Sequence, residues 1–293
     1  MTGRRDSAVP EPQMLDLHDA IDVHVHAGPS FFDRKLDAIS LAEAYRDADL
    51  GGFALKSHFG NTHVPARLAT SLVPGIDVFS STTLNTFVGG FNPTAVEHAL
   101  ATDARVVWLP TFSAANFDPG GVDRTFPFSD QSLCALTDDG DVKLAVVQVV
   151  ETVADADRRV VLGNGHVSRA ETLAVLDLIE ARGLDVPYLV THADFEFMGL
   201  SVEDQVRLAE RGATIEKCYL PVLHGDLTAA ELVESIDAVG VDNCVLSTDH
   251  GQADNDAPPV AYRAFVERLL DAGLSSAELD QLVASADGLV RQQ

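Results

Sequence analysis

The alternation of short apolar segments with longer amphipathic ones constrains the fold of this 293-residue chain more than any other feature. Eight segments are short and rich in Val, Ile and aromatic residues, as strands are, and they cover residues 20–26, 51–58, 76–84, 104–112, 158–166, 186–193, 213–220 and 243–250. Strands that alternate with helices predict an α/β fold with parallel strands, and eight of them predict a distorted (β/α)₈ TIM barrel in a single domain. An open, doubly wound sheet is the alternative, but no glycine-rich turn follows the first strand.

The segments between the strands carry signals for the ends of helices. Ser168 has Glu171 three positions later, which is the spacing of a capping box, and Gly183 supplies the stop. Residues 275–290 predict a terminal helix that closes the barrel. Residues 201–212 and 228–240 have the same arrangement of a capping residue at the start and a glycine at the end as the segment from Ser168 to Gly183.

Two parts of the chain fall outside the strand–helix pattern. Residues 1–13 predict a short flexible tail, which leaves residues 14–293 for the barrel. Residues 113–141 form a long irregular segment after the fourth strand, on the side where barrel enzymes have their sites. Because long structureless loops in compact domains are often functional, we expect this segment to be a lid-like loop.

The chain is strongly acidic, since 45 Asp and Glu residues against 20 Lys and Arg residues give a net charge of −25. Such a surface repels nucleic-acid phosphates and anionic lipids, so we expect neither nucleic acid nor a membrane as a partner. The three cysteines form no CxxC pair, and the sequence has no signal-peptide core and no membrane-spanning apolar run. We therefore expect a cytoplasmic protein with a small-molecule substrate, and the sequence is compatible with a homo-oligomer.

Histidines and carboxylates gather at the C-terminal ends of the predicted strands. The first strand ends in His24 and His26, which are two positions apart and point to one face. Six further polar residues lie at the ends of other strands: Lys56, His58, His166, His192, Glu216 and Asp249. The C-terminal ends of barrel strands meet at one rim, so we expect these side chains in one cavity. Four imidazoles and a carboxylate there predict a transition-metal site.

This arrangement resembles the amidohydrolase superfamily, with HxH after the first strand, single histidines closing the fifth and sixth, and an aspartate closing the eighth. The resemblance extends from Asp22 to about Gln252. It implies that Asp249 contacts the metal and moves protons, and that His192 takes part in catalysis. It also implies that the metal is held by His24, His26, His166 and His192.

Lys56 is a departure from the superfamily pattern. Binuclear members bridge their metals with a carboxylated lysine or a glutamate on the fourth strand, but the fourth strand here reads VVWLPTF. We expect Lys56 to be a carboxylated metal ligand, a catalytic partner of the substrate, or a barrel lysine paired with Glu216. The metal count, one or two, stays open with these alternatives.

Several other residues are candidates for contact with the substrate. Four cations are candidates to hold a substrate carboxylate: Arg34, Lys56, Lys217 and, if the 113–141 loop acts as a lid, Arg124. Three more are candidates with a structural alternative: His58, Trp108 and Glu216. His58 could instead hydrogen-bond to a metal ligand, Trp108 could belong to the core, and Glu216 could orient a ligand histidine or pair with Lys56 or Lys217. Four histidines are predicted to be structural or without a role in the site: His63, His98, His224 and His250.

The resemblance implies a metal-dependent hydrolase, in which an activated water attacks an amide, lactam, cyclic ureide or lactone. We expect cleavage of C–N bonds in preference to C–O bonds. Zn²⁺ is the expected metal, with Mn²⁺ or Fe²⁺ as alternatives. Other functions on this fold are a non-hydrolytic decarboxylase, a metal-free lactonase and a catalytically inactive metal-binding barrel. The presence of the candidate base Asp249 argues against the inactive barrel.

Overall fold

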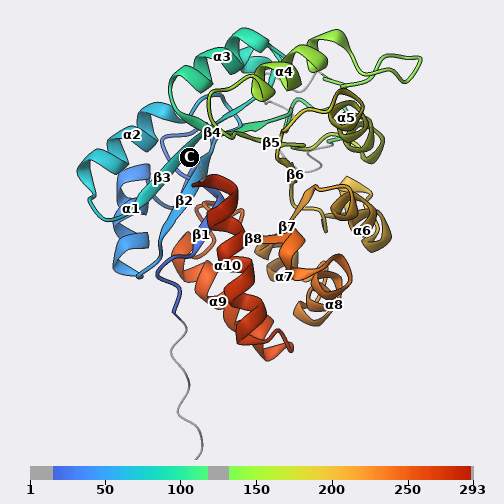
Figure 1. Cartoon of the computed structure of the whole chain (residues 1–293). Helices are drawn as coiled ribbons and strands as arrows, with labels where there is room; N and C mark the ends of the chain where they lie inside the picture. The colour runs from blue at the N-terminus through green and yellow to red at the C-terminus, as the bar shows by residue number, and fades with distance from the viewer. Residues whose placement is uncertain (1–15, 118–131, 292–293) are drawn as a thin grey trace, which may run out of the picture.

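The computed structural model describes residues 16–117 and 132–291 of the chain. Within them, eight parallel strands lie side by side in chain order (Figure 1). Each strand falls inside a segment that the sequence predicts as a strand. The strands are β1 (Ile21–His26), β2 (Gly52–Lys56), β3 (Asp77–Thr83), β4 (Ala104–Trp108), β5 (Val161–Gly163), β6 (Tyr188–Val190), β7 (Thr214–Cys218) and β8 (Cys244–Ser247).

Contacts between β1 and the end of β8 close the sheet into a barrel. The backbone N–H of Asp249 donates to the carbonyl of His24 over 3.0 Å. The N–H of His26 likewise donates to the carbonyl of His250 over 2.8 Å. The predicted (β/α)₈ barrel is therefore confirmed, and the open sheet is excluded.

Helices surround the strands and connect them (Figure 1). They are α1 (Ala38–Asp47), α2 (His63–Leu72), α3 (Pro93–Ala101), α4 (Leu144–Ala154), α5 (Arg169–Arg182), α6 (Val202–Glu210), α7 (Tyr219–His224), α8 (Ala229–Val239), α9 (Pro258–Asp271) and α10 (Ser276–Val290), with 3₁₀ turns η1 (Thr86–Val88), η2 (Glu196–Met198) and η3 (Val241–Asn243). Capping boxes begin α5, α6 and α8, as the sequence predicts. Across residues 16–117 and 132–291, every helix is too short or too polar to cross a bilayer.

Helix α10 closes one end of the barrel. Its Ala286 and Val290 pack against the apolar cluster of strand residues that includes Ile21, Val106 and Trp108. Because α10 contacts β1 and β8 there, the opposite end of the barrel is the one that carries the candidate site.

The long loop after β4 is described at its two ends. The backbone N–H of Leu133 donates to the carbonyl of Ser113, which ties these ends together. Residues 118–131, the middle of the predicted lid with Arg124, lie outside the described residues, as does the predicted tail of residues 1–13.

Candidate active site

The C-terminal ends of the strands surround a cavity of about 620 Å³. This volume is in the range of small-molecule sites. Polar side chains line its deeper part, namely His26, Lys56, His58, His166, His192 and Asp249, and Arg34 and Gln252 also face it. Aromatic side chains line its walls, namely Phe32, Phe112, Phe117, Phe195 and Phe197. The barrel therefore brings most of the predicted strand-end residues into one cavity.

Three of the predicted ligand side chains converge on one point at the bottom of the cavity. Oδ1 of Asp249 lies 3.0 Å from Nε2 of His24 and 3.1 Å from Nε2 of His26. The two imidazole rings are fully or almost fully buried, and the aspartate is 14% exposed. These three side chains could hold one metal ion between them.

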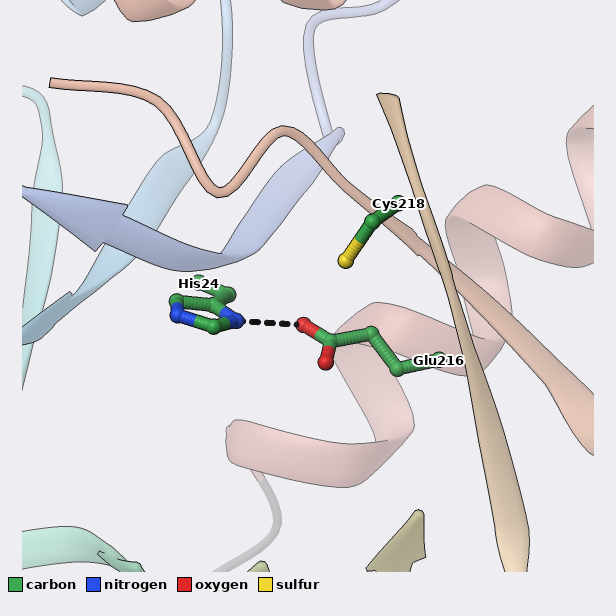
Figure 2. Close-up of side chains that lie close together, drawn as sticks. All are labelled: His24, Glu216 and Cys218. Carbon is green, nitrogen blue, oxygen red and sulfur yellow. Dashed lines mark hydrogen bonds and ion pairs between the residues drawn. The ribbon is translucent and has the colours of Figure 1, made fainter. Parts of the chain in front are cut away.

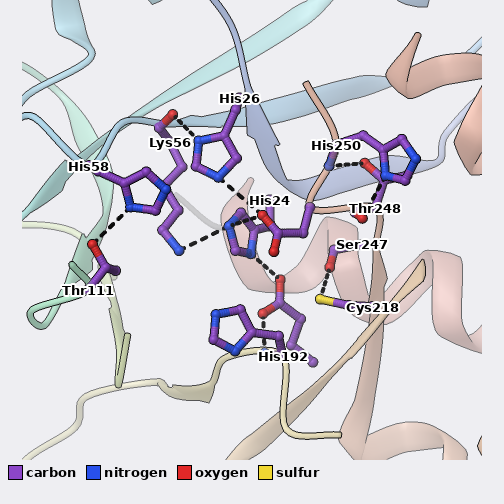
Figure 3. Close-up of polar contacts among 12 residues, drawn as sticks. His24, His26, Lys56, His58, Thr111, His192, Cys218, Ser247, Thr248 and His250 are labelled. Carbon is purple, nitrogen blue, oxygen red and sulfur yellow. Dashed lines mark hydrogen bonds and ion pairs between the residues drawn. The ribbon is translucent and has the colours of Figure 1, made fainter. Parts of the chain in front are cut away.

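Hydrogen bonds to the other ring nitrogens orient both imidazoles (Figure 3). Nδ1 of His24 lies 2.9 Å from Oε1 of Glu216, and Nδ1 of His26 lies 3.0 Å from the carbonyl of Lys56. Because both partners are acceptors, each Nδ1 carries a proton, and each Nε2 faces Asp249. A carboxylate oxygen and two ring nitrogens that meet at about 3 Å need positive charge among them, which a metal ion, a proton on one Nε2 or the nearby Lys56 ammonium can supply.

The backbone near the site is held in an unusual conformation. His192 and Asp249 have positive φ angles of 33° and 54°, which non-glycine residues rarely adopt. Gly251 has a φ of 133°, and a Cβ there would lie 2.0 Å from the carbonyl oxygen of His26. Strain of this kind concentrates at functional sites, where the surrounding packing enforces it.

His166 and His192 each offer a free ring nitrogen. Their Nδ1 atoms are buried and have no hydrogen-bond partner among the described residues. Burial lowers the pKa of His192 to about 4 and that of His166 well below its usual value, so both rings are neutral at pH 7. The ring centres lie 4.9 Å apart. A buried, unpaired imidazole nitrogen is costly unless a ligand uses it.

Lys56 lies beside these histidines. Its Nζ is 2.9 Å from Nε2 of His24 and 4.5 Å from the ring centre of Trp108. Burial lowers its pKa. Glu216 bonds to His24 and to the backbone N–H of His192 and not to Lys56. Of the three alternatives for Lys56, pairing with Glu216 is therefore not formed.

These residues fit a metal ion. Two imidazoles with fixed Nδ1 protons and an ionised carboxylate are typical donors for Zn²⁺ and related cations. A second group, His24, Glu216 and Cys218, also brings donor atoms together (Figure 2). It fits less well, because burial raises the pKa of the Cys218 thiol well above its usual value and Glu216 is already hydrogen-bonded.

Lys217 does not reach the cavity. Residues Glu216 and Lys217 are neighbours in β7 and face opposite sides of the strand. The Lys217 side chain is fully buried, and its Nζ donates to Asp194, Gln205 and Ser235. Its predicted contact with a substrate carboxylate is therefore wrong.

Trp108 and Glu216 lie below the cavity rather than in its wall. Trp108 is fully buried in the barrel interior, with its ring centre 5.2 Å from that of His24. Glu216 is also fully buried and orients His24 through its carboxylate. Both predictions of substrate contact are corrected, because inward-facing residues of β4 and β7 lie one layer deeper than the rim.

His58 and Arg34 do face the cavity. The ring of His58 stacks on Phe112 at 3.8 Å, and its Nδ1 lies 2.9 Å from Oγ1 of Thr111. His250 is buried away from this lining, where it stacks on Tyr219.

Sequence reasoning overlooked Asp22. Its carboxylate accepts hydrogen bonds from Thr248, from Tyr45 and from the backbone N–H of His24. This buried carboxylate therefore ties the start of the HxH motif to the segment that carries Asp249. A lone carboxylate inside an apolar strand, two residues before His24, is the signal that could have identified it, because a buried carboxylate needs hydrogen-bond partners.

Comparisons with known proteins agree with the barrel fold. The structure is similar to a β-aspartyl dipeptidase from Fervidobacterium islandicum (TM-score 0.64, 18% identity, 94% of this chain and 73% of that one). It is also similar to a putative 2-pyrone-4,6-dicarboxylic acid hydrolase from Pseudomonas putida (TM-score 0.56, 14% identity, 93% of this chain and 97% of that one). A third similar structure is a 2,6-dihydroxybenzoate decarboxylase from Rhizobium (TM-score 0.53, 11% identity, 93% of this chain and 98% of that one).

These solved structures are barrels of the amidohydrolase superfamily, and at such low identity they show the fold that the sequence pattern predicts. No curated protein matches the sequence. Residues 19–216 match a family described as a family of unknown function, DUF6282. The chain therefore belongs to the DUF6282 family and has the barrel fold of the amidohydrolase superfamily.

Proposed function

We propose that this protein is a metal-dependent hydrolase that cleaves an amide-type C–N bond of a small molecule. The observation that carries the proposal is the convergence of Asp249 with Nε2 of His24 and of His26 at the bottom of the cavity. Similarity to a dipeptidase structure of the same fold supports a hydrolytic reaction.

His24, His26 and Asp249 would hold the metal. His192 and His166 lie beside them, with ring centres 5.8 Å apart for His24 and His192 and 4.9 Å apart for His192 and His166. A divalent cation such as Zn²⁺ supplies Lewis acidity, which polarises a carbonyl oxygen and makes a water molecule more acidic.

Asp249 is the general base of the proposed reaction. Burial alone would raise the pKa of Asp249, but the contacts with His24 and His26 hold it well below its usual value. The ionised carboxylate accepts a proton from water as the water oxygen bonds to the carbonyl carbon. The C–N bond then breaks, and Asp249 returns the proton to the leaving nitrogen.

Lys56 and His192 are placed to stabilise the negative charge that develops on the carbonyl oxygen. Both line the cavity beside Asp249, and both are almost completely buried. Fixed donors in a site of low dielectric stabilise such a charge more strongly than water does.

The test is the metal content of untagged protein by elemental mass spectrometry, together with the His24→Ala/His26→Ala variant. We expect about one or two equivalents of Zn²⁺, Mn²⁺ or Fe²⁺, lost in this variant but retained in His98→Ala, whose histidine is exposed on α3. Hydrolysis of a panel of amides, lactams and cyclic ureides should stop on chelation and return with Zn²⁺. Folded protein that contains no metal and binds none would overturn the proposal.

A further inference from the structure

The walls of the cavity are aromatic on several sides. Five of the 14 phenylalanines of the chain face it, from the loops after β1, β4 and β6. Phe117 lies 4.4 Å from the ring of His166, and Phe197 lies 5.3 Å from Phe117. Phe195 lies 5.3 Å from the ring of His192. Ring faces and edges therefore extend from the rim down to the candidate metal ligands.

Arg34 brings a cation to the same cavity. It lies in the loop after β1, and its backbone pairs with Gln252 in the segment after β8, which fixes the loop. Its Nε is buried and has no hydrogen-bond partner among the described residues. A buried guanidinium N–H without a partner is costly, and a carboxylate is the ligand that it recognises best.

The cavity carries charges of both signs at different depths. Asp33 and Asp254 also line the cavity, but both side chains are exposed and therefore solvated at its mouth. Arg34 and Lys56 lie deeper, in a protein whose net charge is −25. Asp249 is the one carboxylate beside them among the described lining residues, so the deeper part of the cavity has two cations against one anion and can accept a further anion.

We propose that the substrate is an aromatic carboxylate, with its ring against Phe117 and Phe197 and its carboxylate on Arg34. This inference rests on the proposed function and names the substrate class of the same site. The phenylalanine walls select a flat ring, because aromatic pairs are attracted beyond the area that they bury. Arg34 selects the carboxylate through charge-assisted hydrogen bonds.

The test is ligand binding by NMR titration, on protein as purified and again after removal of metal with a chelator. Benzoate is compared with cyclohexanecarboxylate, which has the same charge without the flat ring, and with benzamide, which has the ring without the charge. We expect benzoate to bind about tenfold more tightly than cyclohexanecarboxylate, from two favourable ring contacts.

Variants separate the two parts of the inference. Arg34→Met should weaken benzoate binding by roughly 10- to 100-fold and leave benzamide unchanged, because only benzoate uses the charge. Phe117→Leu should reduce the preference for benzoate over cyclohexanecarboxylate. Lys35→Met is the matched control, since Lys35 is the neighbouring cation, is exposed and does not line the cavity.

Equal binding of benzoate and cyclohexanecarboxylate, or wild-type affinity in Arg34→Met, would overturn the inference, as would the absence of benzoate binding. These outcomes are independent of the metal analysis. Benzoate binding in a protein that takes up no metal would overturn the proposed hydrolase while the ligand class stands. A protein that contains metal but does not bind benzoate would overturn the ligand class while the proposed hydrolase stands.

Discussion

At the scale of single residues, His24 is the centre of the site because both of its ring nitrogens have a role. Nε2 faces Asp249 and Lys56, while Nδ1 is held by Glu216. Burial alone would raise the pKa of Glu216, but His24, His192 and Lys56 lower it to about 2. The ionised carboxylate therefore keeps the proton on Nδ1 and leaves Nε2 free to bind a metal.

Replacement of this carboxylate by an amide tests that role. Glu216→Gln keeps the shape of the side chain but removes its charge, so we expect metal affinity to fall roughly 10- to 100-fold with little change of fold. Competition with a chromophoric chelator measures the affinity, and circular dichroism checks the fold. Glu210→Gln, at an exposed position on α6, is the control. Equal affinities in both variants would show that Glu216 does not orient the ligand.

At the scale of elements, close contact between β4 and β5 places Trp108 under the site. A Cβ at Gly163 would lie 2.3 Å from Cε3 of the Trp108 ring, so only glycine fits at this position of β5. The ring in turn supports Lys56 and His24.

Gly163→Ala should therefore displace Trp108. We expect a loss of about 1–3 kcal/mol in the free energy of unfolding, which is typical of overpacking. Because Trp108 is the single tryptophan, its fluorescence spectrum should shift as well. Gly183→Ala is the control for the spectrum, since a Cβ there meets no atom within 4 Å. Its φ of 62° should cost stability as well, but its spectrum should match the wild type. An unshifted spectrum in Gly163→Ala would contradict the contact.

An ion pair between neighbouring helices makes stability depend on pH. Asp204 at the start of α6 accepts two hydrogen bonds from Arg169 at the start of α5, over 2.8 and 2.5 Å. These bonds hold the pKa of Asp204 well below its usual value. A depressed pKa contributes stability above about pH 4, where the unfolded carboxyl is ionised, and this contribution is lost as the pH falls below that point.

Asp204→Asn should lower the free energy of unfolding by about 1–2 kcal/mol at pH 7, since it loses the ion pair and part of the capping box. The deficit should shrink as the pH is lowered below about 4. Chemical denaturation of the variant and the wild type at several pH values measures this difference in the free energy of unfolding. A deficit that is independent of pH would mean that the charge of Asp204 contributes nothing.

At the scale of the whole molecule, the excess of 25 negative charges repels itself when the chain is compact. Raising the NaCl concentration from about 0.01 M to about 1 M shortens the Debye length from about 30 Å to about 3 Å. We therefore expect the Tm to rise with salt. Thermal unfolding followed by circular dichroism tests this, with KCl as a check that screening rather than one cation is responsible. A Tm that stays constant or falls would contradict the expectation.

The barrel was predictable because its signals are local. Each strand is a short apolar segment, and α5, α6 and α8 are marked by their own capping residues. Helix α4 lacks such signals: its Val-rich sequence has no capping residue, and the sequence does not predict it as a helix. Packing of Val146, Val149 and Val150 into the core forms this helix, and such tertiary packing can override local propensity.

The sequence by itself determined which residues meet at the rim, because the order of strands in a barrel follows the order of the chain. His24, His26 and Asp249 come together for this reason, although more than 220 positions separate the last from the others. Only the tertiary structure decided the depth and the direction of each side chain. Glu216 and Lys217 are adjacent in sequence, yet one orients a ligand histidine and the other is bonded among outer side chains. The physical reason is that the closed barrel assigns alternate residues of each strand to opposite faces and layers.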